Sequence, residues 1–224
     1  TNIPPHNVGE VCAALLHLIK SPKSTIAKLV DFMPGPDFPT GGGIVEPHEQ
    51  IKEAYSSGRG GFRVRAKYEV ERQKGGTYQI VVTEVPYQVQ KSRLVERIAE
   101  LINDKKLPAL ADVRDESAAD IRLVLEPRSR NIEPAALMEM LFRQTDLETR
   151  FSLNMNVLGA DNTPRVMNLR EVLQAFLDHR HEVLIRRSKH RLAEIERRLE
   201  ILADFGQDLD LGDYLDLCEA RLVK

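Results

Sequence analysis

Apolar and polar side chains alternate strictly over residues 62–72, which predicts a β-strand with one face toward solvent. The turn-forming residues Lys74-Gly75-Gly76 follow, and residues 78–85 are apolar on both faces. A run without a polar face is typical of a buried strand. The two segments therefore predict a hairpin whose second strand lies nearer the centre of a sheet.

Helical periodicity and further strand-like runs surround this hairpin. Apolar residues recur at helical spacing in the segments 8–19, 24–33 and 92–103. Pro134 suits the first turn of another helix, which we expect to end near Arg143. Shorter apolar runs predict strands over the segments 121–125, 151–158 and 165–167. This mixture predicts the fold class α/β, or mixed α+β, with a mixed sheet and flanking helices.

The pattern changes at Asn168, which has the spacing of a helix N-cap to Glu171. No Gly or Pro interrupts the chain before Gly206, so one helix of roughly 35 residues, about 50 Å long, is predicted. Residues 186–191 are polar around nearly two turns, so the helix cannot be buried there and should leave the globular part as an arm.

These patterns divide the chain into three parts. We expect a globular domain over residues 1–167, the long helix over residues 168–203, and a tail over residues 204–224. The helical part carries eight basic and six acidic side chains, whereas the tail carries two basic and six acidic ones. The charge is therefore sorted along the chain, with an acidic tail behind a mildly basic helix.

The composition fits a globular protein and argues against a membrane-spanning chain and against a disulfide-stabilised one. The chain has 224 residues, of which 42% are hydrophobic and 29% are charged. Its apolar runs are too short to span a membrane. No leader precedes Thr1, and the first residues resemble the middle of a fold, which predicts an internal fragment. Cys12 and Cys218 are the only cysteines, which suits a reducing cytoplasm and not a disulfide framework.

A row of basic side chains is the candidate for nucleic-acid binding. Arg63, Arg65 and Lys67 fall on the polar face of the predicted strand, about 6–7 Å apart, near the spacing of successive phosphates in DNA. Arg59 precedes them between glycines, which would let backbone amides approach a phosphate. We call Arg59, Arg63, Arg65 and Lys67 the basic stripe. With a net charge of −2, a solvated strand face is the alternative interpretation, and composition alone favours it.

A cluster of carboxylates precedes the predicted strand at 121–125. It consists of Asp112, Asp115, Glu116 and Asp120. Oxygen ligands of this kind suit Mg²⁺. A solvated loop with Arg114 and Arg122 as counter-charges explains them better, so we predict no metal site. The chain has no Gly-x-x-x-x-Gly-Lys-Ser/Thr loop, which excludes ATP hydrolysis by that route.

Six short strings, in this order and spacing, carry a family resemblance. They are Thr-Asn-Ile-Pro-Pro-His-Asn at 1–7, Gly-Pro-Asp-Phe-Pro-Thr at 35–40, Gly-Arg-Gly at 58–60, Glu-Val-Pro-Tyr-Gln-Val at 84–89, Arg-Asp-Glu-Ser at 114–117 and Met-Asn-Leu at 167–169. The chain thereby resembles the A subunit of bacterial type IIA topoisomerases, over residues 1 to about 203. The segments 105–108 and 145–148 look more like topoisomerase IV than gyrase, which is the close alternative. The tail departs from the family pattern.

The resemblance implies that residues 1–167 form most of the tower-like domain that flanks a bent gate segment of DNA. Residues 168–203 would begin the family's coiled-coil arm. The family's nucleophilic tyrosine lies ahead of Thr1, so no catalytic residue is expected here and the isolated fragment should be inactive. The full protein would be an enzyme that passes one DNA duplex through a transient break in another, held by a phosphotyrosine link.

Partners and cofactors follow from the same resemblance. The implied partners are double-stranded DNA, a B subunit that binds Mg²⁺ and ATP, and a second A subunit within an A2B2 complex. No cofactor is expected in this fragment. The implied location is the cytoplasm, on the chromosome, with peripheral association with the inner membrane as an option. Two other classes stay open: a non-enzymatic coiled-coil interaction module and a stand-alone DNA-binding protein.

Overall fold

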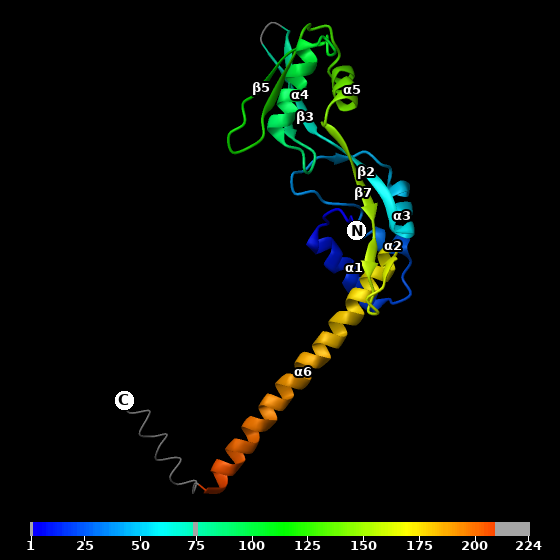
Figure 1. Cartoon of the computed structure of the whole chain (residues 1–224), viewed down its shortest axis with the longest axis vertical. Coiled ribbons are helices and arrows are strands. Elements are labelled where there is room, and N and C mark those ends of the chain that lie inside the picture. Colours follow the sequence, from blue (N-terminus) through cyan, green and yellow to red (C-terminus); the bar gives the residue numbers. More distant parts are fainter. Residues whose placement is uncertain (1, 74–75, 209–224) are drawn as a thin grey trace, which may run out of the picture. The chain divides into compact units, whose positions relative to one another are not determined.

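The structure is a computed structural model that describes residues 2–73 and 76–208, with side chains to residue 203. The chain divides into two compact units, Thr1–Gln174 and Ala175–Lys224. The described elements, in chain order (Figure 1), are α1 (Val8–Lys20), α2 (Ile26–Val30), β1 (Gly43–Ile44), α3 (His48–Ser57), β2 (Arg59–Arg65), β3 (Lys67–Arg72), β4 (Tyr78–Glu84), α4 (Lys91–Asn103), β5 (Leu110–Asp115), β6 (Leu123–Pro127), α5 (Pro134–Gln144), β7 (Glu148–Asn154), β8 (Asn156–Leu158), β9 (Pro164–Val166) and α6 (Leu169–Asp208). This mixture confirms the predicted fold class.

A four-stranded antiparallel sheet in the order β3-β4-β6-β5 forms one layer of the first unit. The predicted hairpin is confirmed, because β4 pairs with β3 on one side and β6 on the other. Ile80, Val81 and Val82 of β4 are at most 2% exposed, as expected of a strand covered on both faces. The helices α4 and α5 cover the face that carries Ile80 and Val82, and their apolar residues complete the core (Figure 1).

A three-stranded antiparallel sheet in the order β1-β2-β7 is the second sheet of this unit. Its central strand β2 buries Phe62 and Val64, each 1% exposed. The Phe62 ring lies 6.2 Å from the ring of Tyr55 in α3. The polar face of β2 therefore points away from this core, which is what places the basic stripe at a surface.

The single strand predicted over residues 62–72 is wrong in one respect. It is two strands, β2 and β3, that belong to different sheets. The break falls at Ala66, whose backbone N–H donates to the carbonyl of Leu147, the residue before β7, whereas Lys67 already pairs with Glu84 of β4. Side-chain alternation continues through the break because it records local backbone geometry and carries no information on the partner strand.

Several other elements and residues also differ from the prediction. The helix α3 and the strand β5 were not predicted, because α3 has only three buried residues in a charged segment and β5 has one. The helix expected over 24–33 is confined to the five residues of α2. On α1 the buried residues are Ala14 and Leu18, whereas Cys12, expected on the apolar stripe, is exposed.

The start of the long helix is confirmed by its capping contacts. The Asn168 backbone N–H donates to the Glu171 carboxylate and the Glu171 N–H donates to Asn168 Oδ1, both at 2.9 Å. This reciprocal pair satisfies two donors that a helix start leaves unpaired. The helix α6 has 40 residues, and the described side chains from 186 to 203 are all exposed, as the polar pattern predicts. None of the described helices combines the length and apolar composition needed to cross a bilayer.

Candidate nucleic-acid interface

The basic stripe lies on two strands. Arg59, Arg63 and Arg65 occupy alternate positions of β2 and share its polar face, whereas Lys67 begins β3 in the other sheet. The stripe is therefore continuous only along β2.

Three of the four cations are held by carboxylates of the protein itself. Arg63 Nε donates to Glu46 Oε1 at 2.9 Å, and the Arg63 backbone N–H donates to the same carboxylate at 2.6 Å. Lys67 Nζ lies 3.0 Å from Glu84 Oε2. The Gly42 N–H, more than Lys67, holds the pKa of Glu84 below its usual range, since both hydrogen bonds favour the charged carboxylate. These cations are neutralised locally.

Arg65 is the most engaged of the four. Its guanidinium donates to Glu148 on β7 and, at 2.7 Å, to Glu139 on α5. It also lies over the Phe142 ring at 4.6 Å. The hydrogen bond to Glu148 is the main cause of a raised pKa for Arg65. These contacts connect β2 to the helix that covers the other sheet, so Arg65 has a structural role whatever else it binds.

Two arginines on this surface have no carboxylate partner among the described residues: Arg59, which was predicted, and Arg150 of β7, which was not. Arg150 stands directly opposite Arg63 in the β2–β7 pairing. The sequence does not indicate that Arg63 and Arg150 are neighbours, because 87 positions separate them. Only the register of the sheet brings them together.

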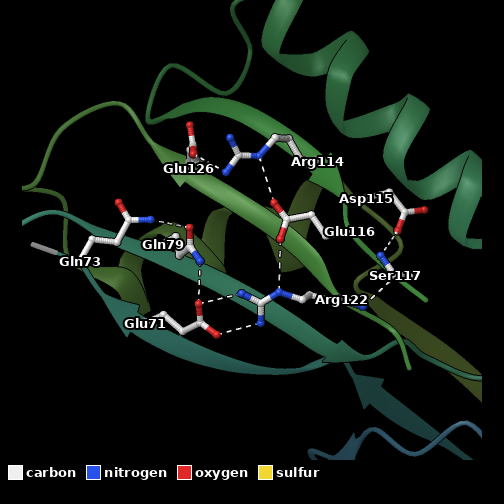
Figure 2. Close-up of polar contacts among 9 residues, drawn as sticks. All are labelled: Glu71, Gln73, Gln79, Arg114, Asp115, Glu116, Ser117, Arg122 and Glu126. Carbon is white, nitrogen blue, oxygen red and sulfur yellow. Dashed lines mark hydrogen bonds and ion pairs between the residues drawn. The ribbon is translucent and has the colours of Figure 1, made fainter. Parts of the chain in front are cut away.

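The outer face of the four-stranded sheet carries a ladder of charged side chains (Figure 2). Arg122 bonds Glu71 through both terminal nitrogens, at 2.8 and 2.9 Å, and reaches Glu116 at 3.3 Å. Arg114 pairs with Glu126 at 2.6 Å. The two arginines are thus the counter-charges that the sequence predicts, although residues 110–115 form β5 and the predicted solvated loop is wrong there.

Two carboxylates of the predicted cluster are held by basic side chains. Asp115 pairs with Lys91 at 2.9 Å, and Glu116 is occupied by the two arginines. Across the described ranges, no three His, Cys, Asp or Glu side chains are grouped so that they could hold a metal ion.

The ladder has a measurable electrostatic consequence. Arg122 first, and then Gln79, donate hydrogen bonds that lower the pKa of Glu71 to about 2 from its ordinary 4.5. Because the folded-state pKa is depressed, the stability contributed by ionised Glu71 is present above about pH 4.5 and is lost as the pH falls toward 2.

Replacing Arg122 with Gln is therefore expected to raise the pKa of Glu71 most of the way back toward 4.5. Carbon-detected NMR titration of the Glu71 carboxyl measures this directly. Arg114→Gln is the matched control, because Arg114 bonds Glu116 and Glu126 but not Glu71. An ordinary Glu71 pKa in the unsubstituted protein would contradict the ladder.

Comparison with known proteins decides the family. The family model for the A subunit of DNA gyrase/topoisomerase IV matches residues 1–215. The chain belongs to this family. The match continues past residue 203, where the resemblance was expected to end, into the tail.

The similar proteins include A subunits of both topoisomerase 4 and gyrase. The DNA topoisomerase 4 A subunit of Caulobacter vibrioides is 59% identical over 225 residues, covering 100% of this chain and 29% of the relative. The protein of the same name from Rickettsia felis is 57% identical over 202 residues, 90% of this chain and 27% of the relative. The DNA gyrase A subunit of Lawsonia intracellularis is 43% identical over 211 residues, 94% of this chain and 26% of the relative. The chain thus spans less than a third of the length of these relatives.

The family strings mostly position structural elements. Asn7 caps α1 by accepting from the Gly9 N–H at 2.9 Å. Phe38 packs between the rings of Tyr87 and Phe151, 5.6 and 5.7 Å away. In the Arg-Asp-Glu-Ser string, Ser117 Oγ accepts from the Arg122 N–H at 2.9 Å, which closes the connection between β5 and β6. These strings mark the family through its framework.

The described tyrosines of this family member also serve the framework. Tyr55 is buried, lies 2.7 Å from His6 through its hydroxyl, and has a pKa raised by burial. Tyr78 donates to the backbone carbonyl of Ile132. Tyr68 and Tyr87 pack against phenylalanine rings. The fifth tyrosine, Tyr214, lies outside the described residues.

Proposed function

We propose that this chain is part of the DNA breakage–reunion subunit of a type IIA topoisomerase, and that it supplies DNA-flanking surface and the start of an arm. The observation that carries the proposal is the family match over residues 1–215, with identity to topoisomerase IV A subunits of 57–59%. The structural use of the described tyrosines agrees with a segment that leaves the nucleophile to another part of the subunit.

Within this proposal, the surface that carries Arg59, Arg63, Arg65 and Lys67 faces the DNA backbone, and contacts to phosphates carry little base specificity. The outer face of the four-stranded sheet suits DNA less well. Its ladder holds three carboxylates, Glu71, Glu116 and Glu126, against the two guanidinium groups of Arg114 and Arg122. This excess of negative charge disfavours phosphate approach.

The whole assembly proposed is an A2B2 complex in the cytoplasm, bound to the chromosome. The partner B subunit would bind ATP and Mg²⁺, and the described residues of this chain offer no alternative metal set. The exposed apolar positions of α6, such as Leu192 (55%) and Leu199 (60%), fit an arm that pairs with another helix. The reaction would be ATP-dependent passage of one duplex through another.

A segment exchange tests this function. Residues 1–224 would replace the matching segment of the Caulobacter vibrioides protein, to which they are 59% identical. We expect the hybrid, mixed with the Caulobacter B subunit, ATP and Mg²⁺, to decatenate DNA within about tenfold of the unmodified enzyme, or about 1.4 kcal/mol of barrier.

The isolated 224-residue chain in the same mixture is the control, and we expect no linear or relaxed plasmid above background. An inactive hybrid that is folded and dimeric would count against the proposed function. Cleavage by the isolated chain would show that a nucleophile lies within it, also against the proposal.

A further inference from the structure

The polar face of the β2–β7 pair gathers basic residues from two distant segments. The register sets Arg59 opposite Asn154, Gly61 opposite Ser152, and Arg63 opposite Arg150. Residues directly opposite in an antiparallel pair point to the same face, so Arg150 joins the face of Arg59 and Arg63. Two like charges opposite one another destabilise a sheet unless an anion lies nearby.

Arg150 lies across Gly61. A Cβ at Gly61 would lie 2.7 Å from Arg150 Nε and 3.2 Å from Nη2, so any larger residue there would displace the guanidinium. Gly61 is midway between Arg59 and Arg63 on the same face. The Arg150 guanidinium therefore lies over the position between Arg59 and Arg63. The Cα atoms of Arg59, Gly61 and Arg63 follow one another at steps of about 7 Å, the repeat of two residues in a strand.

The positive charge of this surface is concentrated around Arg59, Arg63 and Arg150. Among the described residues, Glu46 is the one carboxylate that forms an ion pair with Arg59, Arg63 or Arg150, which leaves an excess of two positive charges. At the other end, Arg65 and Lys67 face three carboxylates, from Glu84, Glu139 and Glu148, which leaves an excess of one negative charge. A polyanion is attracted to the first end and not to the second.

We propose that the phosphate-binding row of this protein is Arg59–Arg150–Arg63, with Arg150 as a direct contact to the backbone of duplex DNA and Arg65 and Lys67 in structural roles. This inference rests on the proposed function, which supplies the DNA. It replaces Arg65 and Lys67 of the basic stripe by Arg150, so that the site lies where β2 and β7 pair. Glu46 moderates the row by holding Arg63.

The test is binding of the 224-residue chain to a fluorescently labelled duplex, followed by anisotropy at several salt concentrations. Removal of one phosphate contact lowers the slope of log affinity against log salt by about 0.9. We expect Arg150→Gln to lower the slope by that amount and to weaken binding about tenfold at 50 mM salt. Arg143→Gln on α5 is the matched control, an exposed arginine with no ion pair among the described residues, and should change neither quantity.

Two further variants separate a phosphate contact from a structural role. Arg150→Lys keeps the charge and should restore the slope. Glu46→Gln keeps an acceptor for the Arg63 N–H but removes the negative charge, so it should tighten binding. A purely structural Arg150 would leave the slope unchanged in both Arg150→Gln and Arg150→Lys.

The outcomes distinguish this inference from the proposed function. One outcome is that the unsubstituted chain binds with a salt-dependent affinity and that Arg150→Gln and Arg143→Gln have the same affinity and slope. The proposed phosphate contact of Arg150 is then wrong, and the proposed function stands. If the chain shows no salt-dependent binding, both the phosphate-binding row and the DNA-flanking role are contradicted. If Arg150→Gln lowers the slope but the hybrid protein is inactive, the phosphate contact stands and the topoisomerase assignment falls.

Discussion

Replacing Gly58 with Ala is expected to lower the free energy of unfolding by about 2–4 kcal/mol, the sum of a left-handed backbone and an overpacked contact. Gly58 ends α3 with φ +70°. A Cβ there would lie well inside van der Waals contact with the backbone carbonyl oxygen of Met167. A carbonyl of the main chain cannot rotate away as a side chain can, so the backbone must shift.

Gly58 also connects segments that are distant in the sequence. The Gly58 carbonyl accepts from the Met155 N–H at 2.9 Å, and Met167 leads into α6. A shift at Gly58 therefore loosens the connection between α3, β8 and the start of the long helix. Urea unfolding followed by circular dichroism measures the effect.

Gly76→Ala is the matched control. Gly76 has φ +79°, but nothing lies within 4 Å of a Cβ placed there. It should therefore show only the cost of the left-handed backbone, about 1–2 kcal/mol. Equal losses in the two variants would mean that the contact with Met167 contributes nothing.

The second large effect is expected for Phe62→Ala, with a loss of about 3–5 kcal/mol. Phe62 is 1% exposed and packs beside Tyr55, in the layer formed by β2 and α3. Removing the ring leaves a cavity that β2 cannot close, because β7 pairs with it on both sides of Phe62, from Arg59 to Arg65.

We expect the melting temperature to fall by roughly 10 °C, at about 2–4 °C per kcal/mol for a chain of this size. Leu158→Ala, at a residue that is 67% exposed, is the control and should stay within about 0.5 kcal/mol. A Phe62 variant as stable as this control would show that the three-stranded layer contributes little to cooperative unfolding.

Local patterns were sufficient where neighbours in sequence make the contacts. Asn168 and Glu171 cap each other across three residues, Pro134 begins α5, and β3 pairs with β4, the next strand in the chain. Lys74 and Gly75 of the predicted turn lie outside the described residues. The ordered strings were sufficient to recognise the family, which the match over residues 1–215 confirms. For the cap, the proline and the hairpin, the determining interactions lie within a few positions of one another in the sequence.

Only the tertiary structure decided which strands pair and which charges meet. The residues 62–72 alternate as one strand, yet they divide between two sheets because β7 and β4 take separate halves as partners. Arg63 and Arg65 share a face, as predicted, but Glu46, Glu139 and Glu148 come from 17, 74 and 83 positions away. Alternation records which face a side chain takes, whereas the register of distant strands determines what stands opposite it. Arg150 reaches the row for this reason alone.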